Sequence, residues 1–301
     1  MSPSSLSFAG SGTQTLTVSN TGGGTLDFTA SDDASWLSVS PASGTAPKDL
    51  TVTADATGLA PGTYNATVTI TAAGASGSPK TVPVTLTVSA PAGGLVGAWG
   101  FDEASGSTTD DASGNGNTGT IANATRTTSG KFGGALTFNG TNAWVTVNDS
   151  SSLHLTGGMT IEGWVNPTTL SGSWRALAVK ETATGLAWAL YPAGDGGFPS
   201  GHAFTTSEQW ARGTSVLPLN TWSHVATTYD GTTIRTYVNG VQVGTKAQTG
   251  SLVTSTQPLR FGGDNVWPEW FEGSLDEIRV YDHALTAAQI QSDMTRPVSG
   301  T

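Results

Sequence analysis

The sequence predicts an all-β protein built from two β-sandwiches, and three observations support this fold class. The 301-residue chain contains 40 glycines, and only 11% of its residues are charged. Segments rich in Thr and Val recur between short turns, and most of them alternate apolar with polar residues, as half-buried strands do. A short segment rich in Pro and Gly divides the chain, and nine of the ten tryptophans follow it, which indicates two domains of different character.

Composition excludes several function classes. The net charge is −10 and the twelve Lys and Arg residues are scattered singly, so no basic surface for nucleic acid is expected. No segment approaches the ~20 consecutive apolar residues that cross a bilayer, so no membrane insertion is expected. Cysteine is absent, which excludes disulfides and zinc–thiolate sites. The composition is typical of secreted or cell-surface modules, although the first residues lack the pattern of a signal peptide. We expect a monomer.

Residues 1–90 predict a small immunoglobulin-like β-sandwich. Short segments with the length and alternation of strands are separated by turns that contain Gly22, Gly23, Gly24 and Pro61. The clearest strands are predicted over residues 14–18, 26–29, 50–53, 64–70 and 82–88. Trp36 is expected in the core, because burial of its large ring stabilises a small sandwich more than exposure does.

Three segments of this domain resemble the BACON family of sandwich domains. They are residues 36–45, with the sequence WLSVSPASGT, residues 62–64 and residues 82–86. The resemblance implies an association with carbohydrate-active proteins, in which the domain either binds sugar or spaces its neighbour from a surface. Residues 91–94 are predicted as a linker, residues 95–295 as the second domain and residues 296–301 as a tail.

The second domain is predicted as a longer series of antiparallel strands. Residues 221–243 form a three-strand meander, in which Asp230-Gly231 and Asn239-Gly240 predict type I′ turns. Thr286 with Gln289 predicts the capping box of a short helix on the rim of the sandwich, and Leu285 with Ile290 predicts its hydrophobic staple.

Seven segments of this domain are similar to LamG-type domains of the concanavalin A-like lectin/glucanase superfamily. They cover residues 94–103, 111–117, 136–140, 161–165, 229–231, 237–240 and 275–281. The resemblance implies a jelly-roll β-sandwich of two facing sheets, one of them concave. Laminarinase-type relatives carry Glu-x-Asp-x-x-Glu on one strand, and this spacing is absent here. The nearest acidic cluster, residues 269–277, includes a turn and two strand faces, so no catalytic residue is predicted.

Calcium is predicted as a structural ion. Asp111-x-Ser113-x-Asn115-Gly116 matches the start of a calcium loop, with oxygen ligands at alternate positions and glycine at the turn. The predicted ligands are Asp111, Asn115, Asn117 and Asp276; resemblance to laminarinase-type relatives implies the last of these. Resemblance to pentraxin-like and laminin-like relatives implies a weaker second site at Asp264 and Asn265. Alternatively, Asp111 and Asn115 only hydrogen-bond their own turn.

Aromatic and planar polar side chains gather between residues 174 and 270. Sugar rings pack on aromatic faces, and their hydroxyls pair with carboxylate, amide or guanidinium groups. The predicted carbohydrate-binding residues are Arg175, Glu181, Trp188, Tyr191, His202, Trp210, Arg212, Trp267 and Trp270, with Trp174 and Lys180 in the same region. Trp99, Trp164 and Trp222 lie in alternating strands and are expected in the core.

Taken together, these patterns predict a non-catalytic carbohydrate-binding module, calcium-stabilised, from a larger secreted bacterial protein whose partner is a polysaccharide or glycan. A structural, adhesive or protein-docking role remains open, and so does a divergent glycosidase.

Overall fold

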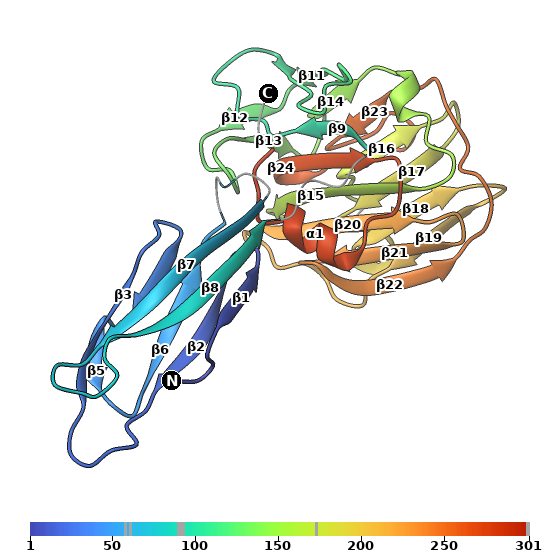
Figure 1. Cartoon of the computed structure of the whole chain (residues 1–301). Helices are drawn as coiled ribbons and strands as arrows, with labels where there is room; N and C mark the ends of the chain where they lie inside the picture. The colour runs from blue at the N-terminus through green and yellow to red at the C-terminus, as the bar shows by residue number, and fades with distance from the viewer. Residues whose placement is uncertain (57–58, 60–61, 89–93, 172–173, 299–301) are drawn as a thin grey trace. The chain divides into compact units, whose positions relative to one another are not determined.

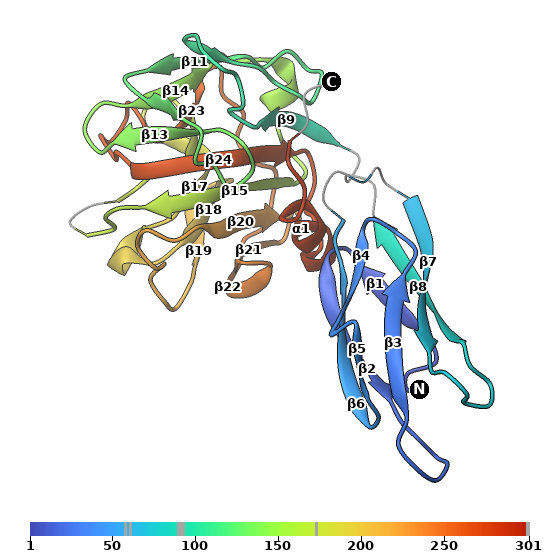
Figure 2. The same cartoon turned by 90° about the vertical axis from the view of Figure 1, so that its left-hand side faces the viewer.

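The computed structural model describes residues 1–56, 59, 62–88, 94–171 and 174–298, and it divides the chain into two compact units, residues 1–91 and 92–301 (Figures 1 and 2). Residues 91–93 of the predicted linker, residues 299–301 of the predicted tail and Pro61 lie outside the described residues. Nearly all regular structure is strand, which confirms the all-β prediction. Among the described helices, none has the length and apolar character needed to span a bilayer.

The first unit is a sandwich of two sheets. The five-stranded sheet has the order β1 (Leu6–Ala9), β8 (Lys80–Val88), β7 (Gly62–Thr71), β3 (Asp27–Asp32) and β5 (Ser43–Thr45). The three-stranded sheet has the order β2 (Gly12–Val18), β6 (Lys48–Ala54) and β4 (Leu37–Ser40). Alternate residues of these strands point inward and form one apolar core, against which Trp36 is half-buried.

The second unit contains two larger sheets, and we name each of them after one of its central strands. The β17 sheet has the order β10 (Thr108–Thr109), β11 (Gly119–Ala122), β14 (Trp144–Val147), β23 (Leu259–Phe261), β16 (Ala178–Glu181), β17 (Leu186–Tyr191), β18 (Ser200–Phe204) and β19 (Glu208–Arg212). The β24 sheet has the order β12 (Thr125–Thr127), β13 (Ala135–Asn139), β24 (Glu272–Tyr281), β15 (Met159–Pro167), β20 (Ser223–Tyr229), β21 (Thr233–Val238) and β22 (Val241–Ala247). Strand β9 (Leu95–Trp99) also pairs with β24.

One apolar core fills the space between these two sheets. Leu190 and Phe261 of the β17 sheet and Ile161 and Val225 of the β24 sheet belong to the same cluster of buried side chains. Trp99 is fully buried in it, as predicted. Trp164 is also buried, but it lies on the outer face of the β24 sheet beneath the Lys131 ammonium, which is 4.1 Å from the ring centroid. Trp222 is half-buried just before β20.

The two predicted hairpin turns differ. Asn239 and Gly240 both have positive φ and join Val238 directly to Val241, which confirms the type I′ turn. At the other turn only Gly231 has positive φ, so the type I′ prediction is wrong. The Asp230 carboxylate accepts hydrogen bonds from the backbone N–H groups of residues 232 and 233, and these bonds stabilise a longer loop instead.

The predicted helix is α1 (Ala287–Asp293). Thr286 and Gln289 form the capping box, and Leu285 and Ile290 are buried together, so both parts of the prediction are confirmed. The helix lies against the outer face of the β24 sheet, where the Tyr281 hydroxyl donates to Asp293 Oδ2 at 2.6 Å. Two single 3-10 turns complete the regular structure, η1 (Ser151–Leu153) and η2 (Asp195–Gly197).

Candidate functional site

The outer face of the β17 sheet carries most of the predicted binding residues. Strand register places one side chain from each of six neighbouring strands in a single row across this face. From β14 to β19 the row contains Thr146, Arg260, Val179, Ala189, His202 and Trp210. The neighbours of these residues along each strand point into the core, because strand side chains alternate between the two faces.

His202 lies next to the end of this row and is surrounded by aromatic rings. It is 1% exposed, and Trp210 stacks over it with ring centroids 5.7 Å apart and an interplanar angle of 14°. The rings of Trp174 and Tyr191 contact it edge-on, at 5.4 and 4.9 Å. Trp210 itself is 42% exposed, so one face of its ring is open to a ligand.

His202 also fixes the position of Glu208. Its Nδ1 lies 2.7 Å from Glu208 Oε1, and its Nε2 lies 3.1 Å from the Ser200 hydroxyl. Burial lowers the pKa of His202, against the opposing effect of Glu208, so the ring is neutral at neutral pH. Because a carboxylate only accepts hydrogen bonds, Nδ1 carries the proton and donates it to Glu208, while Nε2 accepts from Ser200.

The loop of residues 262–271 covers part of the same face. Gly262 makes its first turn possible, because it has φ of 78° and a Cβ there would lie 2.2 Å from the Phe138 ring. Glu181 Oε1 accepts from Asn265 N at 2.6 Å, and Ala176 N donates to Glu269 O at 3.2 Å. The loop is therefore fixed to β16 and carries Trp267, which is 38% exposed.

A pair of carboxyl groups lies beneath this loop. Asp264 Oδ1 accepts from the backbone N–H groups of Val266 and Trp267, at 3.0 and 2.5 Å. Burial, together with the charge of Asp264, raises the pKa of Glu269 to about 8, and burial also raises the pKa of Asp264. Asp264 and Tyr191 both act on the pKa of Glu269, so the three groups are electrostatically linked. At neutral pH the two carboxyl groups therefore hold one proton between them.

A pocket of about 330 Å³ opens beside the exposed Trp267, and we call it the Trp267 pocket. Glu208 lines the pocket with Trp267, and Trp210 lies two residues further along β19 on the same face as Glu208. The remaining lining residues are Thr182, Thr184, Gly185, Leu186, Phe204, Val253 and Thr254. The pocket thus combines aromatic and aliphatic surface with hydroxyl groups and one anchored carboxylate, which is the chemistry that holds a sugar ring.

The structure places two of the predicted tryptophans on the surface and one in the core. Trp210 and Trp267 are the exposed tryptophans among the described residues. Trp188 is 1% exposed and belongs to the core between the sheets, so its predicted role as a binding residue is wrong. Trp270 is half-buried against Trp144, with ring centroids 4.9 Å apart.

The other predicted binding residues hold the scaffold. Tyr191 is buried, so it supports the face from below instead of lining an open trough. Arg175 donates to the carbonyls of Trp270 and Ser171, at 2.8 and 2.9 Å, and secures the loop.

Three charged residues of the predicted region are already paired. Glu181 accepts from Arg260 Nε at 2.9 Å. Arg212 pairs with Asp195 at 2.6 Å. Lys180 points away from the outer face and donates to Asp149 at 2.6 Å, so it is not available to a ligand on that face.

Sequence reasoning missed Glu208, Leu186 and Phe204 in the pocket. Glu208 had a detectable signal, since it precedes Trp210 by two residues on an alternating strand and therefore shares its face. No sequence signal marked Leu186 and Phe204 as pocket residues, because apolar strand residues are ordinarily assigned to the core.

The Asp111 loop is satisfied by its own hydrogen bonds. Both carboxylate oxygens of Asp111 accept hydrogen bonds, from donors that include the backbone N–H groups of Ala98, Ser113 and Asn117. Asn117 is buried, and its side chain donates to the Val96 carbonyl at 2.7 Å. The exposed Asn115 donates to the Leu95 carbonyl. This pattern matches the alternative reading, in which the loop stabilises its own turn.

Asp276 lies in a different environment from the Asp111 loop. Its Oδ2 accepts from the backbone N–H groups of Lys131 and Phe132, at 2.7 and 3.1 Å, so the predicted ligand set does not come together. Its buried Oδ1 has no partner among the described residues, and neither has the buried Oε1 of Glu277. Burial, and next the charge of Glu277, raises the pKa of Asp276 to about 8.

The predicted second metal site at Asp264 and Asn265 lies in the loop of residues 262–271. Oδ1 of Asp264 accepts from the backbone of its own loop, while its buried Oδ2 has no hydrogen-bond partner among the described residues, and Asn265 is exposed with its N–H directed to Glu181. Across the described residues, no three His, Asp or Glu side chains are arranged to hold a metal ion.

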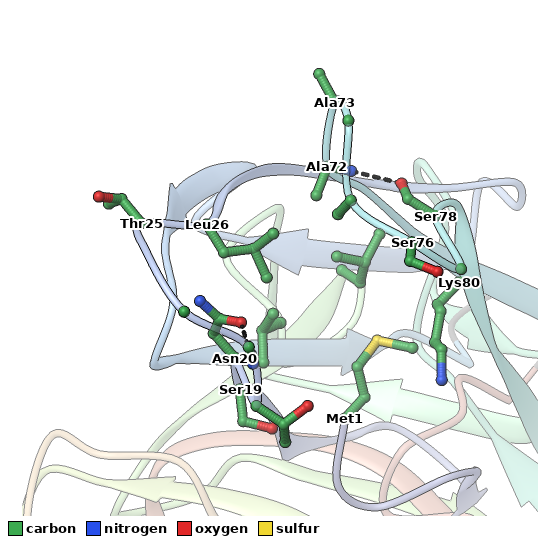
Figure 3. Close-up of a pocket in the computed structure, with 18 residues that line it drawn as sticks. Met1, Ser19, Asn20, Thr25, Leu26, Ala72, Ala73, Ser76, Ser78 and Lys80 are labelled. Carbon is green, nitrogen blue, oxygen red and sulfur yellow. Dashed lines mark hydrogen bonds between the residues drawn. The ribbon is translucent and has the colours of Figure 1, made fainter.

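The first unit has a pocket of its own, of about 600 Å³ (Figure 3). It lies between the β2–β3 and β7–β8 loops, and Asn20, Leu26, Ser76 and Lys80 are among the residues that line it. Lys80 is the single charged side chain among the described residues of the lining, and none of them is aromatic. The pocket therefore offers no ring on which a sugar could stack.

Comparison with known proteins identifies both units. The concanavalin A-like lectin/glucanases superfamily matches residues 139–291, and the viral BACON domain family matches residues 1–89. No curated protein matches the chain.

Solved structures share the fold of the second unit. Domain 4 of AbnA, an extracellular GH43 arabinanase from Geobacillus stearothermophilus, in complex with arabinotriose, has a TM-score of 0.57 at 24% identity, over 67% of this chain and 98% of that domain. The ligand-binding domain of botulinum neurotoxin serotype D, in complex with N-acetylneuraminic acid, has a TM-score of 0.55 at 12% identity, over 67% of this chain and half of that domain. A Trypanosoma rangeli sialidase has a TM-score of 0.53 at 18% identity, over 69% of this chain and 33% of that chain.

The family matches occur in the order that the sequence motifs predicted, with a BACON domain first. Through its larger second unit, the chain belongs to the concanavalin A-like lectin/glucanase superfamily.

Proposed function

We propose that the second unit binds glycans without cleaving them, at the Trp267 pocket. The observation that carries this proposal is a pair of exposed tryptophan rings near Glu208: Trp267 lines the pocket with Glu208, and Trp210 follows it by two residues on the same face of β19. Exposed tryptophans on a rigid sheet provide flat apolar platforms for sugar rings. Glu208 is held by His202 before a ligand arrives, so little ordering is needed on binding.

Two features of the carboxyl groups support a binding role over hydrolysis. Retaining glycosidases place two carboxyl groups ~5 Å apart across the sugar bond, and inverting ones place them further apart. Here Asp264 and Glu269 act on each other's pKa beneath the loop, and neither of them lines the Trp267 pocket. Glu208 is the one carboxylate among the residues that line the pocket. Incubation with arabinan, laminarin and alginate should therefore release no new reducing ends; release that Glu208→Gln abolishes would identify an enzyme.

Binding is tested by titrating the protein with oligosaccharides, beginning with arabinotriose, while tryptophan fluorescence and heat are measured. At least one glycan should quench the fluorescence. Trp267→Ala and Trp210→Ala should each weaken its binding about tenfold, which corresponds to about 1.4 kcal/mol. Val241→Ala is a matched control, because Val241 is 62% exposed on the other sheet. If no glycan changed the fluorescence or released heat, the proposal would be contradicted and the structural or adhesive role favoured.

We also propose that calcium stabilises the second unit, near Asp276 instead of at the Asp111 loop. The residues fit a hard cation, because Asp276 and Glu277 each present a buried oxygen without a partner. Asp102 adds a third negative charge that acts on both. Bound calcium would supply a positive charge beside Asp276, whereas Glu277 already pairs with Arg279 at 3.2 Å through its other oxygen, and backbone carbonyls would complete the shell of six to eight oxygens around the ion.

The calcium proposal predicts a thermal shift. Calcium at 100 times its Kd should raise the free energy of unfolding by about 2.7 kcal/mol, and EDTA should reverse this gain. Asp276→Asn should abolish the response, while Asp111→Asn should retain it despite a lower Tm. If only Asp111→Asn lost the calcium-dependent rise in Tm, the ion would bind at the Asp111 loop and not near Asp276.

We further propose that the chain is part of a larger secreted protein, in which the first unit acts as a spacer. Support comes from the first unit's pocket, which lacks aromatic rings. Substitution of Lys80 by Ala should therefore leave glycan binding unchanged.

A further inference from the structure

We propose that the Trp267 pocket selects non-acidic glycans and rejects sugar acids, through the fixed negative charge of Glu208. This inference rests on the proposed function and names the ligand class of the same site. The superfamily fold alone does not decide this, since structures with the same fold hold a neutral sugar in one case and a sialic acid in another.

Glu208 is the charged side chain of the pocket, and one of its oxygens is free for a ligand. Its Oε1 accepts from His202 Nδ1, and no described residue donates to its Oε2. The side chain is 32% exposed, so a ligand can reach it. A sugar hydroxyl can donate to Oε2, and such charge-assisted hydrogen bonds are stronger than neutral ones. A sugar carboxylate has no proton to donate at neutral pH, and it would meet a like charge there.

Two arginines of this region are already paired with carboxylates. Arg260 pairs with the buried Glu181 at 2.9 Å, and its guanidinium lies 4.0 Å from the Trp144 ring centroid. Arg212 pairs with Asp195 at 2.6 Å. His202 is neutral, because its burial disfavours the charged ring. Among the described residues that line the pocket, none is a cation that could pair with a sugar acid.

Beneath the loop, the Asp264–Glu269 pair adds further negative charge. The pair retains one negative charge when it holds one proton, and Trp267 N donates directly to Asp264. The rings of Trp267 and Trp210 contribute in the same direction, because the faces of aromatic rings are electron-rich and repel anions. Both the charged groups and the rings of the site thus disfavour a sugar acid.

The experiment compares matched pairs of oligosaccharides that differ in a carboxylate on every sugar, such as mannotriose with trimannuronate and galactotriose with trigalacturonate. Arabinotriose and N-acetylneuraminic acid are measured as well. Isothermal titration calorimetry at pH 7 and low salt measures each Kd. For the backbone that binds, the neutral form should bind at least tenfold more tightly than the acidic form. Salt should narrow the difference, because it screens the repulsion.

The variant Glu208→Gln removes the charge and keeps the shape. It should weaken neutral binding and narrow the neutral-to-acidic ratio to below threefold. Asp282→Asn is the matched control, because Asp282 is also an exposed carboxylate that contacts a histidine Nδ1, that of His283 at 2.9 Å. The control should preserve both affinities, and both variants should retain the wild-type Tm within a few degrees.

The outcomes separate the two proposals. If an acidic glycan binds as tightly as its neutral counterpart, or if Glu208→Gln leaves the ratio unchanged, the selectivity inference is overturned and glycan binding stands. If no glycan binds at all, the proposed function fails and the inference fails with it.

Discussion

The buried carboxyl pair beneath the Trp267 loop makes stability depend on pH in a way that one substitution should remove. Burial and Asp264 raise the pKa of Glu269 to about 8, against an ordinary value of 4.5. The folded state therefore retains a proton that the unfolded state releases above pH 4.5. The stability from this group is fully present below pH 4.5 and is lost as pH rises toward 8, with a slope of at most about 1.4 kcal/mol per pH unit.

Glu269→Gln should make this contribution independent of pH. The amide of glutamine has nearly the shape of the carboxyl group and stays neutral at every pH of the experiment. The variant should match the wild type near pH 4.5 and exceed it at pH 9 by several kcal/mol at most. Urea denaturation at pH 4.5, 7 and 9 measures the difference. Asp276, with a pKa of about 8, and Glu277, at about 7, also titrate, but their effects occur in both proteins and cancel.

Glu272→Gln is the control for this experiment, because Glu272 lies three residues away at the start of β24. It should show the wild-type pH dependence. The reasoning is refuted if Glu269→Gln and the wild type lose stability in parallel from pH 4.5 to 9, since the proton would then not reside on Glu269.

Two further predictions test the placement of individual side chains. Trp188→Ala should lower the free energy of unfolding by about 3–5 kcal/mol, because the ring fills the core, whereas Trp210→Ala should change it far less and weaken glycan binding instead; equal losses of stability would contradict the assigned faces. Thr286→Ala should cost about 1 kcal/mol by removing the cap of α1, and Thr286→Ser should restore it; no change in thermal denaturation would show that packing alone holds the helix.

Much of the fold could be predicted because its signals are local. The Asn239-Gly240 turn and the Thr286 capping box are encoded within a few residues, and both form as predicted. The Asp230-Gly231 turn shows the limit of such reasoning. There the Asp230 side chain satisfies the loop backbone, and this competes with the shorter turn.

The site was harder to predict because it depends on which face of each strand is covered. Strand β17 is apolar at every position and buried on both sides, so the sequence around Trp188 carries no alternation that marks its inner face. Trp210 alternates with the buried Ala211, and this pattern indicates its outward direction. The position of the loop over Tyr191 follows from contacts between segments about 70 residues apart, which local patterns do not encode.

Strand β24 has a consequence for how the protein is made. It is formed near the carboxyl-terminal end of the chain, yet it pairs with β9 and β13 on one side and with β15 on the other. The partners are separated from it by more than a hundred residues of chain. The β24 sheet cannot close until the chain has been synthesised through Tyr281, and until then β9, β13 and β15 stay without their central partner.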